Sequence, residues 1–169
     1  MPLYFAYGAN LDRAAMEKRC PRSKPLGVAR LMRHRLCVMR EGWLTVARDS
    51  RQSVHGVLWD LALSDVPGLD RFEQVGSGLY AKITQPVVTP SAAKRALVYV
   101  GANAGPGRVQ PDYIATVLEA ARKWPLAEEG ISVLARLARE AGVKVEAEAA
   151  PAPKVFQVRP RFATPMDRG

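Results

Sequence analysis

The chain opens with an apolar segment, residues 4–7, that carries no charge and predicts a buried strand. Gly8 breaks this pattern, and Asn10 has the side chain of a helix N-cap ahead of a helical segment at residues 12–17. A strand that turns into a helix at a glycine directs several unpaired backbone N–H groups at one point. The turn is therefore a candidate cradle for a carboxylate or an oxyanion, although an ordinary strand-to-helix turn would have the same pattern.

The next part of the chain alternates between apolar and polar positions. Residues 28–39 place apolar side chains among arginines and predict one or two strands with a solvated outer face. A turn at residues 41–42 leads to a short strand at 44–47, and the polar residues 48–53 predict a loop. The clearest central strand is at residues 54–61, because its side chains divide into two faces with a period of two.

Helical periodicity then replaces the strand pattern. A short helix is predicted from Ser64, as its cap, to Glu73, and Pro67 fits the first turn, where its missing N–H costs little. Residues 79–88 and 95–100 predict a hairpin of two strands.

Two later helices complete the predicted domain. Pro111 can occupy the first position of a helix with an apolar stripe that reaches Trp124, and a second helix at residues 127–141 ends before Gly142. Periodicity fades after residue 142, so we expect a domain at 1–142 and a linker with an extended basic tail at 143–169. The elements predict an α+β domain with a mixed or largely antiparallel sheet, for which closure into a barrel is one option. A Rossmann fold is not expected, because no G-x-G-x-x-G follows the first strand.

Composition excludes several classes of protein. The 48% hydrophobic and 24% charged residues are typical of a globular domain, and no apolar run is long enough for a membrane span. We expect a cytoplasmic protein. The net charge of +9, from 25 basic and 16 acidic residues, invites nucleic-acid binding, but the basic residues are dispersed and favour a solvated face. Cys20 and Cys37 lack the spacing of metal ligands, so no metal site is expected.

Glu73 is the most suggestive acidic residue. It follows Phe72 at the predicted end of a helix and precedes a glycine-containing loop at residues 74–78. A carboxyl group beside an aromatic ring in a dry pocket has a raised pKa and can exchange protons near neutral pH. A solvated glutamate at a helix end would have the same surroundings in the sequence, and these residues alone favour that interpretation.

Three segments together resemble the γ-glutamylcyclotransferase-like family, also called AIG2-like. Residues 7–11, Tyr-Gly-Ala-Asn-Leu, are similar to its Y-G-S-N-L signature. Residues 56–59, 69–73 and 78–80 resemble its G-V-x-W strand, its L-D-x-x-E helix end and its glycine-tyrosine strand start. Residues 111–113 are similar to an element that supplies a tyrosine to the pocket. The segments follow the family's order and spacing over residues 4–124.

The resemblance implies a small mixed β-barrel with flanking helices and a cofactor-independent γ-glutamylcyclotransferase of the acyltransferase or lyase type, acting in glutathione metabolism. The α-amine of a γ-glutamyl compound would attack its own γ-carbonyl and release 5-oxoproline and an amine or amino acid. Glu73 would be the catalytic general base and then the general acid. The implied substrate-binding residues are Tyr7, Gly8, Ala9, Asn10, Leu11 and Tyr113. For Tyr113, core packing on the helix stripe is an equal alternative.

Two positions depart from the family pattern. Ala9 stands where the family usually has serine, and Gln74 stands where glycine commonly follows the catalytic acid. Gln74 favours an alternative hypothesis, in which the fold is a non-catalytic module that binds a small anion. The expected partner is a small γ-glutamyl molecule, and a homodimer is left open. No membrane is expected, and nucleic acid is a weaker third hypothesis.

Overall fold

The computed structural model describes residues 1–146, so the part of the predicted tail from 147 to 169 lies outside the described residues. Five strands form a closed barrel in the order β1-β3-β2-β4-β5. Neighbouring strands pair antiparallel, except that β1 and β5 run parallel. The predicted α+β class with a small mixed barrel is therefore confirmed. The strands are β1 (Leu3–Ala6), β2 (Lys24–Val38), β3 (Leu44–Asp60), β4 (Tyr80–Val88) and β5 (Ala93–Gly101).

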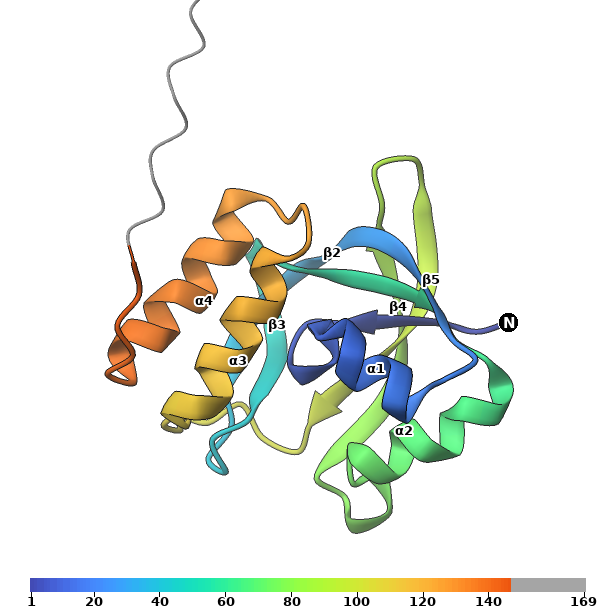
Figure 1. Ribbon diagram of the computed structural model, residues 1–169, viewed down its shortest axis with the longest axis horizontal. Helices are drawn as coiled ribbons and strands as arrows, with labels where there is room; N and C mark the ends of the chain where they lie inside the picture. Colours follow the sequence, from blue (N-terminus) through green and yellow to red (C-terminus); the bar gives the residue numbers. More distant parts are fainter. Residues whose placement is uncertain (147–169) are drawn as a thin grey trace, which may run out of the picture.

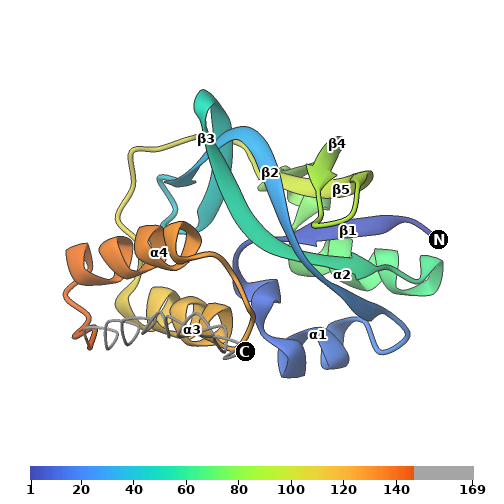
Figure 2. The ribbon, with the colours of Figure 1, turned by 90° about the horizontal axis from the view of Figure 1, so that it is seen from above.

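Four α-helices flank this barrel (Figure 1). Helices α3 and α4 pack side by side on one flank, and α1 and α2 lie next to each other beneath the strands (Figures 1 and 2). The helices are α1 (Arg13–Arg19), α2 (Val66–Phe72), α3 (Pro111–Arg122) and α4 (Glu128–Glu140). No helix in the described residues is both long and apolar enough to cross a membrane.

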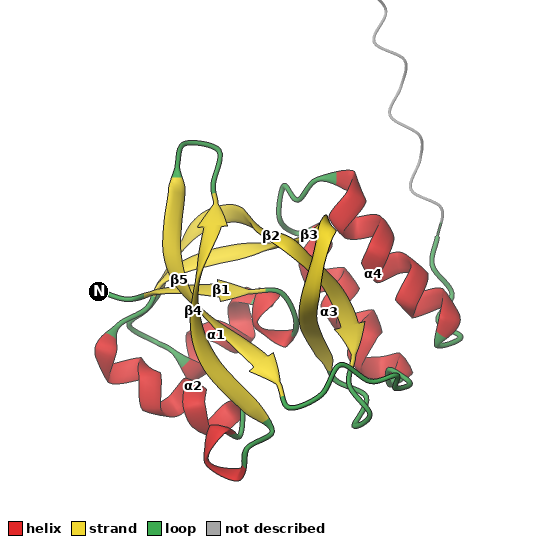
Figure 3. Ribbon diagram, turned by 180° about the vertical axis from the view of Figure 1, so that it is seen from behind, coloured by secondary structure: helices red, strands yellow, loops and turns green. Residues whose placement is uncertain are grey.

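The strand directions bring distant segments to one end of the barrel. Strands β1 and β5 are parallel, and β3 and β4 run antiparallel to them. The C-terminal end of β5 lies beside the N-terminal ends of β4 and β3, because Gly101 pairs with Tyr80 and its N–H donates to the hydroxyl of Thr45 at 2.8 Å. The turn after β1 reaches the same end, where Gly8 lies next to Leu44. The tip of the β4–β5 hairpin projects from the other end of the barrel (Figure 3). This common end collects the segments that follow β1 and precede β3 and β4.

The predicted loop at residues 48–53 is wrong, because these residues lie within the span of β3. The pairing with β2 is irregular here: Arg48 lies opposite His34 and Ser53 opposite Met32, so the register shifts at this point. Asp49 stabilises the extra residues through its carboxylate, which accepts hydrogen bonds from the backbone N–H of residue 51 and the side chain of residue 52. The polar residues 48–53 are therefore an irregular part of one long strand and not a loop between two strands.

The predicted helix caps also need correction. Asp12, and not Asn10, caps α1, and its Oδ1 accepts hydrogen bonds from the N–H groups of Ala14 and Ala15 at 2.9 and 3.2 Å. Ser64 lies in a 3-10 turn (Leu63–Asp65) ahead of α2 and is not its cap. Asn10 does not cap the helix, because its side chain forms hydrogen bonds with Tyr4, Arg19 and Glu73.

The core fills the barrel and continues under α3 and α4. Gly56 allows β1 and β3 to approach each other closely, since an added Cβ would lie 2.2 Å from the carbonyl oxygen of Ala6. Gly142 ends α4 with a φ of +84°, as predicted. Val143 and Val145 still pack against the core, so packing continues beyond the predicted boundary at residue 142.

Candidate functional site

A cavity of about 460 Å³ lies at the end of the barrel where β1 and β5 finish. All five tyrosines of the chain line it, and Arg19 and Glu73 are its charged lining residues. It is large enough for a small molecule. The lining consists of Tyr4, Tyr7, Gly8, Ala9, Asn10, Arg19, Trp43, Leu44, Phe72, Glu73, Gln74, Leu79, Tyr80, Tyr99 and Tyr113.

Helix α2 delivers Glu73 to this cavity. Glu73 follows the last residue of the helix, and its N–H donates to the carbonyl of Leu69 at 2.9 Å, which fixes its backbone. Burial raises the pKa of its carboxyl group to about 7, while the positive charge of Arg19 and a hydrogen bond from Asn10 act in the opposite direction. A carboxyl group with this pKa can both accept and return a proton near neutral pH.

Asn10 connects Glu73 to the N-terminal turn. Its amide Nδ2 donates to Glu73 Oε1 and to the hydroxyl oxygen of Tyr4, both at 2.9 Å. Its Oδ1 accepts a hydrogen bond from Arg19 Nη1 at 2.7 Å. Asn10 is only 2% exposed, and both its amide N–H groups and its amide oxygen have hydrogen-bond partners. This buried amide therefore holds one oxygen of Glu73. Within residues 1–146 the other carboxyl oxygen accepts no hydrogen bond, which leaves it to a ligand.

The turn after β1 forms one wall of the cavity. The N–H of Leu11 donates to the carbonyl of Gly8 at 2.9 Å and closes a 3-10 turn (Ala9–Leu11). The N–H groups before Leu11 have no partner within such a turn, and Gly8, Ala9 and Asn10 all line the cavity. These residues lie where a cradle of backbone donors was predicted. Leu11 is different: its side chain is fully buried in the core and does not line the cavity.

Arg19 joins the site from the last turn of α1. Its guanidinium carbon lies 3.5 Å from the centroid of the Phe72 ring, in addition to its bond to Asn10. Burial lowers the pKa of Arg19, and the nearby charge of Glu73 opposes that shift. Sequence reasoning missed this residue, because an arginine at the end of a helix is ordinarily solvated and nothing local links it to Asn10.

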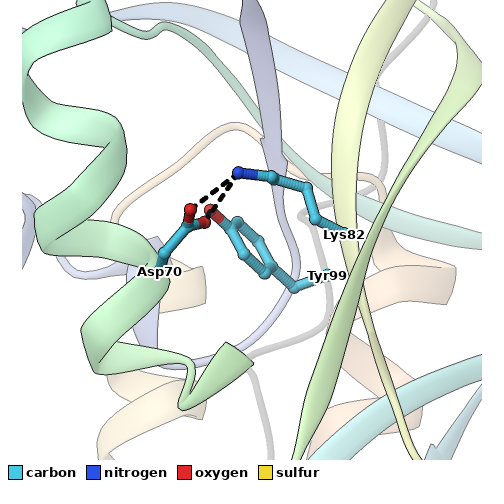
Figure 4. Close-up of polar contacts among 3 residues, drawn as sticks. All are labelled: Asp70, Lys82 and Tyr99. Carbon is cyan, nitrogen blue, oxygen red and sulfur yellow. Dashed lines mark hydrogen bonds and ion pairs between the residues drawn. The ribbon is translucent and has the colours of Figure 1, made fainter. Parts of the chain in front are cut away.

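An ion-pair cluster fixes α2 against the barrel (Figure 4). Asp70 Oδ1 accepts a hydrogen bond from the hydroxyl of Tyr99 at 2.6 Å, and Lys82 Nζ lies 2.7 Å from Oδ2. Burial would raise the pKa of Asp70, but the hydrogen bonds from Lys82 and Tyr99 outweigh it and lower that pKa. Asp70 lies one helical turn before Glu73, so this cluster also fixes the position of Glu73.

Two tyrosines meet the start of β3. The hydroxyl of Tyr80 donates to the carbonyl of Leu44 at 2.6 Å, and the N–H of Leu44 donates to the hydroxyl oxygen of Tyr113 at 3.4 Å. The Tyr113 hydroxyl also lies beside Gly8, where an added Cβ would approach it to 3.3 Å. Tyr113 therefore lines the cavity beside the N-terminal turn, and its hydroxyl proton has no acceptor among residues 1–146. Burial raises its pKa to about 12, so the hydroxyl stays protonated near neutral pH.

Other lining residues also escaped sequence analysis. Trp43 precedes β3 and packs edge-on against Tyr113 with ring centroids 5.1 Å apart. In the sequence Tyr99 has the pattern of an ordinary strand residue, because its hydrogen bond to Asp70 of α2 forms only in the folded protein. Within residues 1–146 no group of three or more His, Cys, Asp or Glu side chains could hold a metal ion.

Comparisons with known proteins agree with this architecture. The sequence model of the AIG2-like family matches residues 53–134. The γ-glutamylcyclotransferases of Bos taurus and Mus musculus are 34% and 35% identical to the chain over an alignment of 97 residues, and the match covers 52% of this chain and 52% of each relative. The chain thus spans about half the length of these relatives.

A solved structure described as a γ-glutamyl cyclotransferase is similar over a larger part of the chain. It has a TM-score of 0.73 and 27% sequence identity, and the match covers 79% of this chain and 85% of that one. The family match at 53–134 includes Glu73 and Tyr113 but not the turn at residues 7–10. That the turn at residues 7–10 lines the same cavity follows from the coordinates of this protein.

Proposed function

This chain belongs to the AIG2-like, γ-glutamylcyclotransferase-like family, and from that premise we propose that it converts a γ-glutamyl compound into 5-oxoproline and a free amine or amino acid. The observation that carries the proposal is the contact of Glu73 with Asn10 inside the cavity. It places a carboxyl group with a pKa of about 7 beside the turn of backbone N–H groups. A proton carrier and a set of oxyanion donors thus share one site.

The reaction needs little beyond these groups. The substrate's α-amine is already tethered to its γ-carbonyl, so attack within the molecule needs positioning but no covalent intermediate with the protein. A C–N bond forms between the α-nitrogen and the γ-carbonyl carbon, and the bond to the departing amine nitrogen breaks. Glu73 takes one proton from the attacking ammonium group and returns it to the departing nitrogen, and a second proton passes from the new ring nitrogen to the same nitrogen, so that the amine leaves as an ammonium ion. Atoms and charge balance without water as a reactant.

The remaining lining residues suit a folded glutamyl unit. Backbone N–H groups of Gly8, Ala9 and Asn10 would hold the oxygen that becomes negative in the transition state. Ala9 fits this role despite the missing serine hydroxyl, since a backbone N–H is the donor. Tyr113 would donate its hydroxyl to the glutamyl unit, and Arg19 would attract its carboxylate. The net charge of +9 favours the approach of an anion.

The test is release of 5-oxoproline from a panel of γ-glutamyl amino acids and γ-glutamyl amines, followed by mass spectrometry. Glu73→Gln should keep the bond to Asn10 and lose about 100-fold or more of the rate. The matched control is Glu119→Gln on the exposed face of α3, which should leave the rate unchanged. No lactam from any substrate, or full activity in Glu73→Gln, would contradict the proposal.

One observation favours a second candidate function. Gln74 directly follows Glu73, lines the cavity and has a left-handed backbone with a φ of +52°, a conformation that suits glycine better. A side chain at this position narrows the space beside Glu73. The alternative is therefore a module that binds a small anion without converting it. A compound that raises the melting temperature of the protein and is recovered unchanged would support it.

A further inference from the structure

The mouth of the cavity contains exposed aromatic surface. In the described part of the chain, the aromatic side chains that are more than a third exposed are Trp43 and Phe72, at 37% and 39%. Both line the same cavity, and so does the partly buried Leu79. Large apolar side chains that border a pocket and remain open to water indicate a surface that a ligand covers.

Much of the inner wall is apolar as well, because three of the five lining tyrosines already donate their hydroxyl protons within the protein. Tyr7 donates to the carbonyl of Tyr99, and Tyr99 donates to Asp70. The hydroxyl of Tyr80 is bonded to the backbone of Leu44. These three tyrosines therefore present ring surface to the cavity and no free hydroxyl proton.

Among residues 1–146, the charged side chains that line the cavity are one cation and one acid. Arg19 is the cation, and its contacts with Asn10 and Phe72 hold it at the polar side of the cavity beside Glu73. One guanidinium group suits one carboxylate, that of the glutamyl unit itself. A second carboxylate on the departing amine would lie among aromatic rings and near Glu73 without a cation, which is unfavourable.

We infer that the amine released from the substrate is apolar, so that the preferred substrates are γ-glutamyl amides of aromatic or branched aliphatic amines without a carboxylate. This inference rests on the proposed function and names its substrate class. The glutamyl unit lies at Asn10 and Glu73, and the apolar group covers Trp43, Phe72 and Leu79. The chemistry is unchanged: the amide bond to the apolar amine breaks as the lactam forms, and Glu73 returns the proton to that amine.

The experiment compares substrates that differ by one carboxylate. One pair is γ-glutamyl-phenethylamine and γ-glutamylphenylalanine, and the other is γ-glutamyl-isopentylamine and γ-glutamylleucine. The amides without the carboxylate should have kcat/KM values about tenfold or more higher. Equal values, or a preference for the amino acids, would overturn the inference and leave the cyclisation itself standing.

Binding without reaction separates the two proposals. Glutaryl amides of phenethylamine and of phenylalanine lack the α-amine and cannot cyclise, so calorimetry with the wild-type protein measures affinity alone. The phenethylamide should bind about tenfold more tightly. Such a preference without lactam from any substrate would contradict the proposed reaction and support the apolar site. Equal affinity, or no binding of either amide, would overturn the apolar site.

Trp43→Ala tests the contact residue. It should lower kcat/KM for γ-glutamyl-phenethylamine several-fold and reduce the preference within the pair. Leu63→Ala is the matched control, because Leu63 is 70% exposed and lies outside the cavity lining. Thermal unfolding verifies that both variants fold. A folded Trp43→Ala protein with an unchanged preference would contradict the assignment.

Discussion

Asn10 and Glu73 are 63 residues apart in the sequence, and the amide of one donates a 2.9 Å hydrogen bond to the carboxyl group of the other. This bond joins the turn after β1 to the end of α2. It occupies one carboxyl oxygen of Glu73, and no other described residue bonds to the second oxygen. The bond fixes the orientation of the Glu73 carboxyl group. Together with the charge of Arg19 it also lowers the pKa that burial raises.

The rate of lactam release should rise with pH through a midpoint of about 7. Burial raises the pKa of Glu73 to this value, and the carboxylate form is the one that accepts the ammonium proton. The rate at pH 5 should therefore be about 100-fold below the plateau, since two pH units below the pKa leave about 1% carboxylate. A kcat/KM profile between pH 5 and 9 measures this. A flat profile would show that Glu73 is not the base.

Arg19→Gln should shift that profile to higher pH. The positive charge of Arg19 lowers the pKa of Glu73, so removing it raises the pKa and reduces the carboxylate fraction at pH 7. We expect a several-fold loss of rate at pH 7 and partial recovery at pH 9. Arg13→Gln is the matched control on the same helix, because Arg13 stacks on Trp124, 3.8 Å from its ring centroid, and lies outside the cavity lining. Identical midpoints in both variants would contradict the assignment.

Tyr113→Phe and Tyr80→Phe should separate activity from stability. Tyr113→Phe removes a hydroxyl group that faces the cavity and accepts only a long bond of 3.4 Å from Leu44. We expect about a tenfold loss of rate and little change in stability. Tyr80→Phe leaves the Leu44 carbonyl without its 2.6 Å partner and should cost about 1 kcal/mol of unfolding free energy. Denaturant unfolding and rate assays on both variants check this, and the reverse pattern would contradict it.

Asp70→Asn should lower the free energy of unfolding by about 1–2 kcal/mol at pH 7, because it removes charge-assisted bonds to Lys82 and Tyr99. The pKa of Asp70 is lowered in the folded state. Its contribution is therefore present above its ordinary pKa of 3.8 and is lost as the pH falls through the lower folded pKa.

Denaturant unfolding of the Asp70→Asn variant at pH 7 and near pH 3 measures the difference and its decline. Glu119→Gln is the control, since the pair of Glu119 with Lys123 is highly exposed and contributes about 0–1 kcal/mol. If the loss in Asp70→Asn were no larger than in this control, Asp70 would not anchor α2.

Gly56→Ala should destabilise the barrel by several kcal/mol. The new Cβ would lie 2.2 Å from the Ala6 carbonyl oxygen and 2.7 Å from the Phe5 ring, so β1 has to move. Gly76→Ala is the matched control, because no atom lies within 4 Å of the added Cβ. Thermal unfolding compares the two. Equal melting temperatures would show that β1 can shift without cost, and the turn at residues 7–10 would not depend on close packing of β1.

The parts of the fold and site that local pattern determines were predictable. Periodicity located most strands and the two late helices, and family resemblance pointed to Glu73 and the N-terminal turn. Asn10 was misread as a helix cap, because its side chain is fixed by Glu73 and Tyr4 in the folded protein. Arg19 was missed for the same reason: its partners come together only when α1 and α2 pack.

Strand β1 pairs with β3 on one side and with β5 on the other, so the ring closes only when β5 joins it. A ribosome has to complete residue 101 before both neighbours of β1 exist. Of the five strands, β1 is therefore made first, and its neighbour β5 is made last. A growing polypeptide has no finished cavity until all five strands and Tyr113 have been synthesised.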